Sequence, residues 1–247
     1  MIDIQKARLV FKEFINKYDN QEDFGFNLKV VHTYFVSNNA KELATKLNLS
    51  EEDIQLAELI GLLHDIGRFE QIKKYNSYDD SNNMNHADYG ALLLFEKGLI
   101  KYFWKNEKDY ELIRFAIENH NKLTIPIIDD ERIMKFAKLI RDVDKLDIIY
   151  IYAFLDDVKF NVSDESISKS VLDDIKSHRV VERINRNNVN NEIALSFAYA
   201  FDINNNVIIK EFIKNIEKFY SKLNSDIFSD IFNEVDDYLK KREILCL

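Results

Sequence analysis

SEEDIQLAELIGLLHDIGR, residues 50–68, is the stretch that decides the fold of this chain. Ser50 followed three residues later by Asp53 predicts a helix N-terminus with a side-chain cap. The helix is apolar around most of its circumference, so we expect it to be buried. Its apolar residues are Ile54, Ala57, Leu59, Ile60, Leu62 and Leu63. His64 and Asp65 follow, and ionisable groups beside an apolar run cost free energy unless they are paired or bind a metal. The two are therefore either a surface-facing pair at a fraying helix end or part of a metal site.

The composition predicts an all-α protein. The chain has 247 residues, of which 46% are hydrophobic and 31% charged, as in an ordinary soluble protein with a sizeable core. Five glycines and one proline, with abundant Leu, Ile, Lys, Glu and Asn, favour long helices over linkers. We expect a single helical domain over residues 1–247.

The sequence also narrows the environment and the partners. Cys246 is the one cysteine, so no disulfide forms within the chain. The N-terminus has no signal-peptide pattern, and the longest apolar stretch, about 148–155, is far shorter than the roughly 20 residues that span a bilayer. We therefore expect a cytoplasmic protein with no membrane partner. A net charge of −9 disfavours nucleic acid, although local basic groups could still hold a small phosphorylated ligand.

Apolar periodicity predicts two helices before the central stretch. The first covers residues 2–18, and the polar residues around Gly25 break the chain after it. The second covers about 28–47 and carries His32. Its apolar face is predicted to consist of Leu28, Phe35, Val36, Ala40, Leu43 and Leu47. His32 is spaced four residues from two members of this face, so it points toward the core.

Two further histidines are predicted near helix ends. A short helix starts near Asn85 or His86 and stops before Gly98. Another helix covers residues 109–121, where His120 continues an apolar row at four-residue steps. Both histidines therefore lie on or beside buried faces.

A long helix with acidic residues in its first turn is predicted over residues 129–155. It holds two candidate carboxylates, Asp142 and Asp144. Apolar residues lie four and seven positions from Asp144, whereas Lys138 and Lys145 flank Asp142. Periodicity therefore places Asp144 toward the core and Asp142 toward a more solvated side.

Residues 156–247 are predicted to form a helical extension with Asn-rich turns. Its helices are expected at about 164–185, 192–201, 207–222 and 225–243. His178 lies in a strongly polar context and is predicted to be a surface residue. The extension could supply walls, packing or an oligomer contact.

Six residues that suit a metal centre fall at element ends or on predicted buried faces. They are His32, His64, Asp65, His86, His120 and Asp144. Packing alone explains so many buried histidines poorly, whereas imidazole and carboxylate together suit Mn, Fe, Co, Ni or Zn, and carboxylate also tolerates Mg. Six ligands exceed the usual set for one catalytic metal. We expect one or two divalent metal ions, with two the natural count and Asp65 able to bridge them.

The order His … His-Asp … His … His … Asp, with HDIG at its centre, resembles that of the HD-domain superfamily of metal-dependent phosphohydrolases. The resemblance covers about residues 25–155, which would form an HD-type helical bundle, with 156–247 as its extension. HDIGRFEQ (64–71) and HADYGALLLFE (86–96) are most similar to one bacterial group of these hydrolases. The resemblance implies hydrolysis of a phosphomonoester or phosphodiester of a nucleotide or small metabolite.

The resemblance also implies a division of the ligands between two metals. The residues that match the ligands of the first metal are His32, His64, Asp65 and Asp144. His86 and His120 match the extra histidines of the two-metal branches. Some members with single histidines at both extra positions are mixed-valent di-iron oxygenases, so an oxygenase is an alternative. A non-catalytic signalling module is a second alternative, although such modules normally lack part of the ligand set.

Two departures separate this chain from particular branches of the superfamily. HD-GYP phosphodiesterases carry a second histidine where this chain has Asn121, and this chain has no GYP motif. HD nucleotidases carry a glutamate shortly after the HD pair, where this chain has Arg68. Neither specific activity is therefore implied.

Residues next to the HD pair could contribute to catalysis. Gly67 lets the backbone turn or approach a neighbour closely. The fork of donors on Arg68 suits a phosphate, but Arg68 could instead form a salt bridge to Glu70 or Asp88. Asp65 could double as a metal ligand and the general base for the attacking water.

Three more residues are candidates for substrate contact. Lys145, directly after Asp144, could neutralise phosphate charge or be a solvated helix lysine. Tyr75 and Tyr78 precede a polar loop, DDSNNMN (79–85), and could cover the site or pack against the protein.

Overall fold

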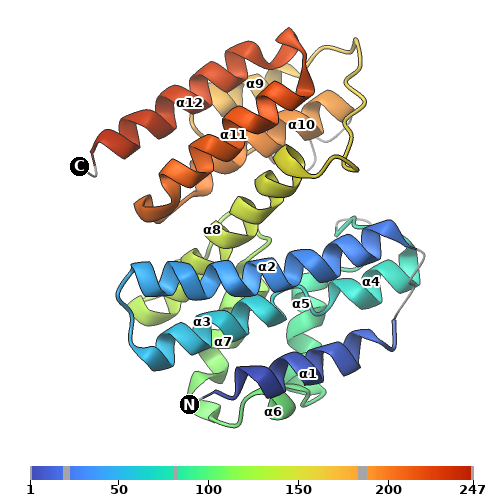
Figure 1. Cartoon of the computed structure of the whole chain (residues 1–247), viewed down its shortest axis with the longest axis vertical. Helices are drawn as coiled ribbons and strands as arrows, with labels where there is room; N and C mark the ends of the chain where they lie inside the picture. The colour runs from blue at the N-terminus through green and yellow to red at the C-terminus, as the bar shows by residue number, and fades with distance from the viewer. Residues whose placement is uncertain (1, 19–22, 81–82, 183–187, 246–247) are drawn as a thin grey trace. The chain divides into compact units, whose positions relative to one another are not determined.

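The computed structural model describes residues 2–18, 23–80, 83–182 and 188–245. Helices are the only regular elements in these ranges, which confirms the all-α fold class. The chain divides into two compact units, Met1–Val143 and Asp144–Leu247 (Figure 1). No helix in the described ranges is both long and apolar enough to cross a membrane. Cys246 lies outside these ranges.

The first unit contains the elements that carry the four buried histidines. Its helices are α1 (Ile4–Ile15), α2 (Phe24–Lys46), α3 (Glu51–Leu63), α4 (Arg68–Tyr75), α5 (His86–Ala91), α6 (Ile100–Phe103), α7 (Tyr110–Asn119) and the first part of α8 (Glu131–Phe154). The caps follow the sequence: the Ser50 side chain accepts a hydrogen bond from the Asp53 N–H at 3.2 Å, and Asn85 caps α5. A π-helical segment, Leu92–Glu96, extends α5 toward Gly98, which has a positive φ of 72°.

Helices α2 and α3 lie side by side in the first unit (Figure 1). Their backbones approach closely because Gly61 has no side chain: a Cβ there would lie 2.7 Å from Cα of Ser37. The Ser37 hydroxyl donates to the Glu58 carbonyl across the same contact at 2.9 Å. This close packing brings His32 on α2 to the end of α3, with its ring centroid 5.4 Å from that of His64.

The start of α2 differs from the prediction at Gly25. We expected Gly25 to break the chain before a helix that begins near Leu28, but α2 begins at Phe24 and includes Gly25 in its first turn. Asp23 explains the earlier start, because its side chain accepts from the Phe26 N–H at 2.9 Å. An N-terminal cap of this kind stabilises the first turn enough to accommodate a glycine.

The buried face of α2 is also rotated from the predicted one. Phe35 is 46% exposed, whereas its neighbour Val36 is fully buried. Adjacent residues on a helix point about 100° apart, so both cannot lie at the centre of one buried face. The side chains that α2 buries are Phe26, His32, Thr33, Val36, Ser37, Ala40, Leu43 and Ala44. The prediction for Phe35 was therefore wrong, and the one for His32 is confirmed.

Periodicity also misplaced Asp142 on α8. Asp142 was expected on a solvated side, but it is fully buried, and Asp144 is partly exposed. The helix is enclosed around most of its circumference here, since Arg141 and Val143 are buried as well. When a helix is covered on more than one side, apolar periodicity does not show which of two residues is the more buried.

Arg141 fixes the end of α7 to α8. The residue is 1% exposed, and its guanidinium donates to the carbonyl oxygens of Asn119, His120 and Lys122 at 2.8, 3.2 and 2.6 Å. The last carbonyls of a helix have no partner within the helix. Arg141 supplies those partners and so holds the backbone of His120 in place.

The first helix that follows α8 in the second unit is shorter than we predicted. A helix was expected over about 164–185, but α9 covers Lys169–Lys176, and residues 183–185 of the prediction lie outside the described ranges. The chain before α9 is held by the Asn190 and Asn191 side chains: Asn190 donates to the Ser163 carbonyl at 2.9 Å, and Asn191 accepts from the Ser168 N–H at 2.9 Å. Such side-chain bonds to backbone replace the helical ones.

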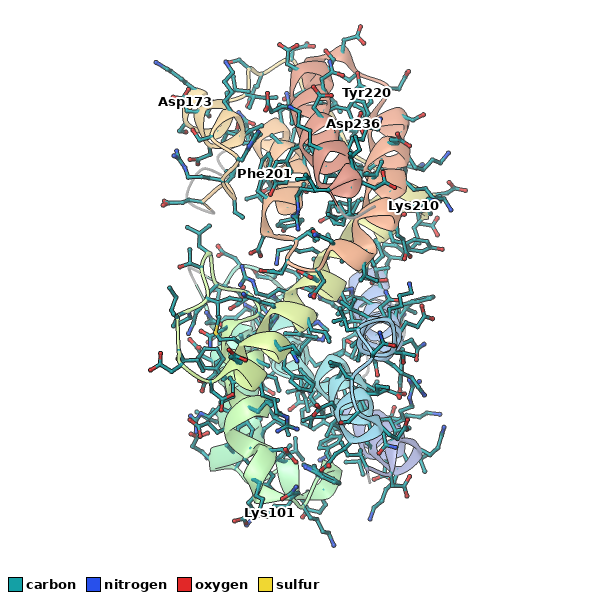
Figure 2. The ribbon with its side chains drawn as sticks, turned by 90° about the vertical axis from the view of Figure 1, so that its left-hand side faces the viewer. Lys101, Asp173, Phe201, Lys210, Tyr220 and Asp236 are labelled. Atoms are coloured by element: carbon teal, nitrogen blue, oxygen red, sulfur yellow. The ribbon has the colours of Figure 1, made fainter. Side chains whose placement is uncertain are left out.

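The other helices of the second unit match the predicted segments approximately. They are α10 (Val189–Ala198), α11 (Ile209–Leu223) and α12 (Ser229–Ile244). The ring of Tyr220, labelled in Figure 2, stacks on Phe232 with centroids 4.3 Å apart, which joins α11 to α12. His178 is exposed and pairs with Glu234 at 2.7 Å, so its prediction as a surface residue is confirmed.

Candidate metal centre

Four buried histidines gather around the carboxylate of Asp65. Nε2 of His86 and Nε2 of His120 lie 2.9 and 3.7 Å from Oδ1 of Asp65. Nε2 of His64 and Nε2 of His32 lie 3.4 and 3.6 Å from Oδ2. All five residues are at most 3% exposed. Two imidazoles therefore lie near each oxygen of the same carboxylate.

Two overlapping sets of side chains have the spacing that a metal ion requires. One set is His64, Asp65 and His120, and the other is His32, His64 and Asp144. In each set the candidate ligand atoms lie within 4.8 Å of one another. Nε2 of His86 lies 3.0 Å from Nε2 of His120, next to the first set. The structure thus brings together all six residues that the sequence singled out.

The hydrogen bonds of the imidazoles determine which nitrogen faces the centre with a lone pair. Nδ1 of His64 lies 2.7 Å from the Gly61 carbonyl, and Nδ1 of His120 lies 2.7 Å from the Ile117 carbonyl. A carbonyl oxygen only accepts, so Nδ1 carries the proton in both rings and Nε2 carries a lone pair. A partner on the far nitrogen is the usual way in which a protein orients a histidine that binds a metal.

Positive charge stabilises the arrangement: the Lys29 ammonium pairs with Asp65, and a guanidinium nitrogen of Arg68 lies 3.2 Å from Nε2 of His86. Nε2 of His120 presents a lone pair, and Nε2 of His86 lies only 3.0 Å from it, beside an ionised carboxylate. Electron-rich atoms buried at such distances repel unless a proton or a metal ion lies among them. A set of imidazole nitrogens and carboxylate oxygens fits Mn, Fe, Co, Ni or Zn.

The pKa directions agree with a cation-binding site. Burial, reinforced by the charges of His86 and His64 and opposed by Asp65, lowers the pKa of His120 to about 4. Its ring is therefore neutral at pH 7, as a metal ligand must be. Burial disfavours the charged form of Asp65, but Lys29, His64 and His86 outweigh it and hold the Asp65 pKa well below its usual value.

Gly67 allows the HD turn to approach α5. A Cβ at this position would fall on the His86 carbonyl oxygen and lie 2.6 Å from the Gly90 nitrogen. The close approach predicted from the sequence is therefore confirmed. It brings the first residue of α5, His86, against Asp65.

Lys29 is a functional candidate that sequence reasoning missed. Its ammonium group forms an ion pair with Oδ2 of Asp65, and its side chain is 18% exposed. Lys29 precedes His32 by three residues on α2, so the two share a face. That spacing was the available signal, but a lysine on an amphipathic helix usually marks its solvated side.

Arg68 lies beside the centre with most of its donors engaged. It is 7% exposed, and its guanidinium contacts Asp80 at 3.1 Å, the Tyr78 carbonyl at 3.0 Å and the Gln71 side chain. Its Nε lies 4.0 Å from Oδ1 of Asp65. The salt bridge that we considered with Glu70 or Asp88 is thus made with Asp80 instead.

Tyr78 lies beside Arg68, whereas Tyr75 is exposed and lies beside Lys74. The Tyr78 ring lies 5.8 Å from the Arg68 guanidinium, and its hydroxyl approaches Gly25 at the start of α2. Burial, with the nearby charge of Asp23, raises the pKa of Tyr78 to about 12. Tyr75 is 37% exposed, and its ring lies 5.0 Å from the ammonium of Lys74.

Lys145 and its ion-pair partner both belong to the second unit. Its ammonium lies 2.7 Å from Oδ2 of Asp202, and the residue is 6% exposed. This contact gives Lys145 a structural role on α8, and its predicted substrate contact stays a prediction.

The sequence also gave no indication of Asp80, Gln71 and Asn121. Asp80 accepts from Arg68, Gln71, Asn121 and His86. Asp80 belongs to a polar segment without periodicity, and Asn121 is the last residue of the helix predicted over 109–121, so only the tertiary structure reveals their contacts.

Residues 30–149 match the family model of the HD domain. This range contains all six candidate ligands and ends within α8. Comparison with curated proteins and with solved structures gives no match.

Proposed function

Because residues 30–149 are an HD domain, we propose that this chain is a metal-dependent phosphohydrolase. Its substrate would be a phosphomonoester or phosphodiester of a nucleotide or small metabolite. The observation that carries the proposal is the approach of four imidazole Nε2 atoms to the one buried carboxylate of Asp65. Neither packing nor hydrogen bonding requires such an arrangement.

The residues divide into two ligand groups that share Asp65. His32, His64, Asp65 and Asp144 would hold a first divalent ion, and His86 and His120 would add a second beside Oδ1 of Asp65. When bound, divalent metal ions polarise a phosphoryl oxygen and make a water more acidic. Burial of Asp65 and the four histidines strengthens their interaction with a cation, because water does not screen it.

The chain's own charged groups would orient the substrate and neutralise its charge. The low pKa of Asp65 favours its role as a ligand over its role as general base, because a weakly basic carboxylate takes up a proton poorly. Lys29 is a partly exposed cation beside this carboxylate and would face the phosphoryl oxygens of a substrate. The contacts of Arg68 favour a positioning role for it over direct phosphate binding.

A di-iron oxygenase is the second candidate function. The observation that favours it is the pair His86 and His120 beside one oxygen of Asp65, since this pair completes a two-metal ligand set. Both candidates need the same ligands, so the reaction and the preferred metal distinguish them.

Phosphate release from a panel of phosphomonoesters and phosphodiesters tests the proposal. The protein is reconstituted separately with Mn²⁺, Ni²⁺, Mg²⁺ and Fe²⁺, and His64→Ala is compared with His178→Ala, a substitution of an exposed histidine in the second unit. We expect hydrolysis in the wild type and His178→Ala, and none in His64→Ala. Tightly bound iron with O₂ uptake, and no phosphate release with any of the metals, would overturn the phosphohydrolase in favour of the oxygenase.

A further inference from the structure

Asp80 is the buried acceptor of the segment between α4 and α5. Its side chain is 4% exposed, although the residue lies in a polar connection. Oδ1 lies 2.6 Å from Nδ1 of His86, 3.1 Å from a guanidinium nitrogen of Arg68 and 3.1 Å from Nε2 of Gln71. Oδ2 accepts from Nδ2 of Asn121 at 3.2 Å. A surface loop acid rarely has so many donors around it.

The contact with His86 orients that ring. The carboxylate of Asp80 can only accept, so Nδ1 of His86 carries a proton. A guanidinium nitrogen of Arg68, which can only donate, lies 3.2 Å from Nε2, so Nε2 presents its lone pair. Oδ1 also accepts from the His86 backbone N–H at 3.3 Å, which fixes the residue at the first turn of α5. Nε2 is thereby directed at Oδ1 of Asp65, 2.9 Å away.

The same network ties the connecting segment to the helices around the site. Arg68 donates to the Tyr78 carbonyl, and Gln71 donates to the carbonyls of Asp79 and Met84 at 3.2 and 2.5 Å. These bonds hold both described ends of the segment against α4. Asp80 joins them to His86, so residues 78–80 of this connection are bonded to the histidine site.

We propose that Asp80 is a positioning residue that fixes His86 as a ligand of the second metal ion. This inference rests on the proposed two-metal centre. Outer-shell carboxylates of this kind typically change metal affinity by about 10- to 100-fold when they are removed. Asp80 would act through His86, whose Nδ1 and backbone N–H it binds, so its loss should weaken one of the two metal sites selectively.

Equilibrium dialysis of the full chain against Mn²⁺ tests this inference by counting bound ions at each concentration. Asp80→Leu removes the acceptor, and Asp80→Asn keeps one oxygen while it removes the charge. Asp88→Asn, which changes an exposed acid of α5, is the control.

We expect two Mn²⁺ sites in the wild type and in the control. In Asp80→Leu the second site should bind Mn²⁺ about 10- to 100-fold more weakly. Asp80→Asn should retain part of that affinity, which a general loss of structure would not produce. Circular dichroism shows whether Asp80→Leu is folded, and if it is not, Asp80→Asn alone decides.

Three outcomes would overturn the inference. They are equal second-site affinity in the wild type and in the folded Asp80 variants, equal weakening of both sites, and a single Mn²⁺ site in the wild type. Two Mn²⁺ sites with the expected selective loss, but no phosphate release from any ester, would overturn the proposed function and leave the role of Asp80 intact.

Discussion

The ammonium group of Lys29 forms an ion pair with Oδ2 of Asp65, the carboxylate around which the four buried histidines gather. Lys29 therefore supplies positive charge at a place where a divalent ion would also bind Asp65. A metal ion and the ammonium group compete for the same oxygen, so metal binding should release Lys29 toward the substrate.

Replacing Lys29 with methionine should tighten metal binding and destabilise the metal-free protein. Without its competitor, Mn²⁺ should bind Asp65 about tenfold more tightly, or ~1.4 kcal/mol. The metal-free variant should lose about 3 kcal/mol of stability, because a buried carboxylate loses its partner. Isothermal titration calorimetry and urea unfolding in EDTA measure the two effects. Lys46→Met, an exposed change on α2, is the control, and weaker Mn²⁺ binding in Lys29→Met than in the wild type would refute the competition.

The metal-free protein should become less stable as the pH falls from about 6.5 to about 4. The pKa of His120 is lowered from 6.5 to about 4, so in this window the unfolded chain binds a proton that the folded chain does not. Such a difference removes up to about 3 kcal/mol of stability. Asp65 acts in the same direction at lower pH, since the stability from its depressed pKa is lost as the pH falls through its folded-state pKa.

Urea unfolding in EDTA at several pH values measures this dependence. His120→Asn should show a smaller loss between pH 6.5 and pH 4 than the wild type, and the control His178→Ala should retain the wild-type loss. Identical pH profiles for the wild type and His120→Asn would show that His120 is not the responsible group.

Gly67→Ala should disturb the metal centre and not only the stability. Its Cβ would collide with backbone atoms of His86 and Gly90, which no side-chain movement relieves. We expect a loss of about 1–3 kcal/mol in unfolding free energy and a weaker second metal site. Gly98→Ala is the comparison, because Gly98 has a φ of 72°, which alanine adopts only with strain, but nothing lies within 4 Å of an added Cβ. Gly98→Ala should lose stability and keep its metal; loss of metal in both variants would contradict the specific role of Gly67.

Helical periodicity predicted the buried histidines well, and side chains that depend on tertiary contacts poorly. His32 and His120 lie at regular spacing from apolar residues, so the sequence alone indicated that they are buried. Phe35 was misplaced because it is next to Val36, and the sequence pattern did not show which of these two apolar residues faces the core. Asp142 was misplaced because α8 is covered on more than one side. Lys29 and Asp80 were missed because a lysine on a helix and an acid in a polar loop usually face water.

The helix predicted over about 164–185 shows the same limit in the second unit. Within the described part of that range, residues 164–182, the only α-helix covers Lys169–Lys176. Asn190 and Asn191, more than twenty residues later, bind the backbone that precedes this helix. Local sequence patterns do not predict such bonds between residues that are far apart in the chain.

Metal content per chain, measured by plasma mass spectrometry after reconstitution and desalting, tests the two-metal centre most directly. The samples are the wild type, His86→Ala and the control His178→Ala. We predict about two ions per chain in the wild type and the control, and about one in His86→Ala. One ion in all three would remove His86 from the ligand set. No metal in the wild type, after reconstitution with Mn²⁺, Fe²⁺, Ni²⁺ or Zn²⁺, would contradict the metal centre itself.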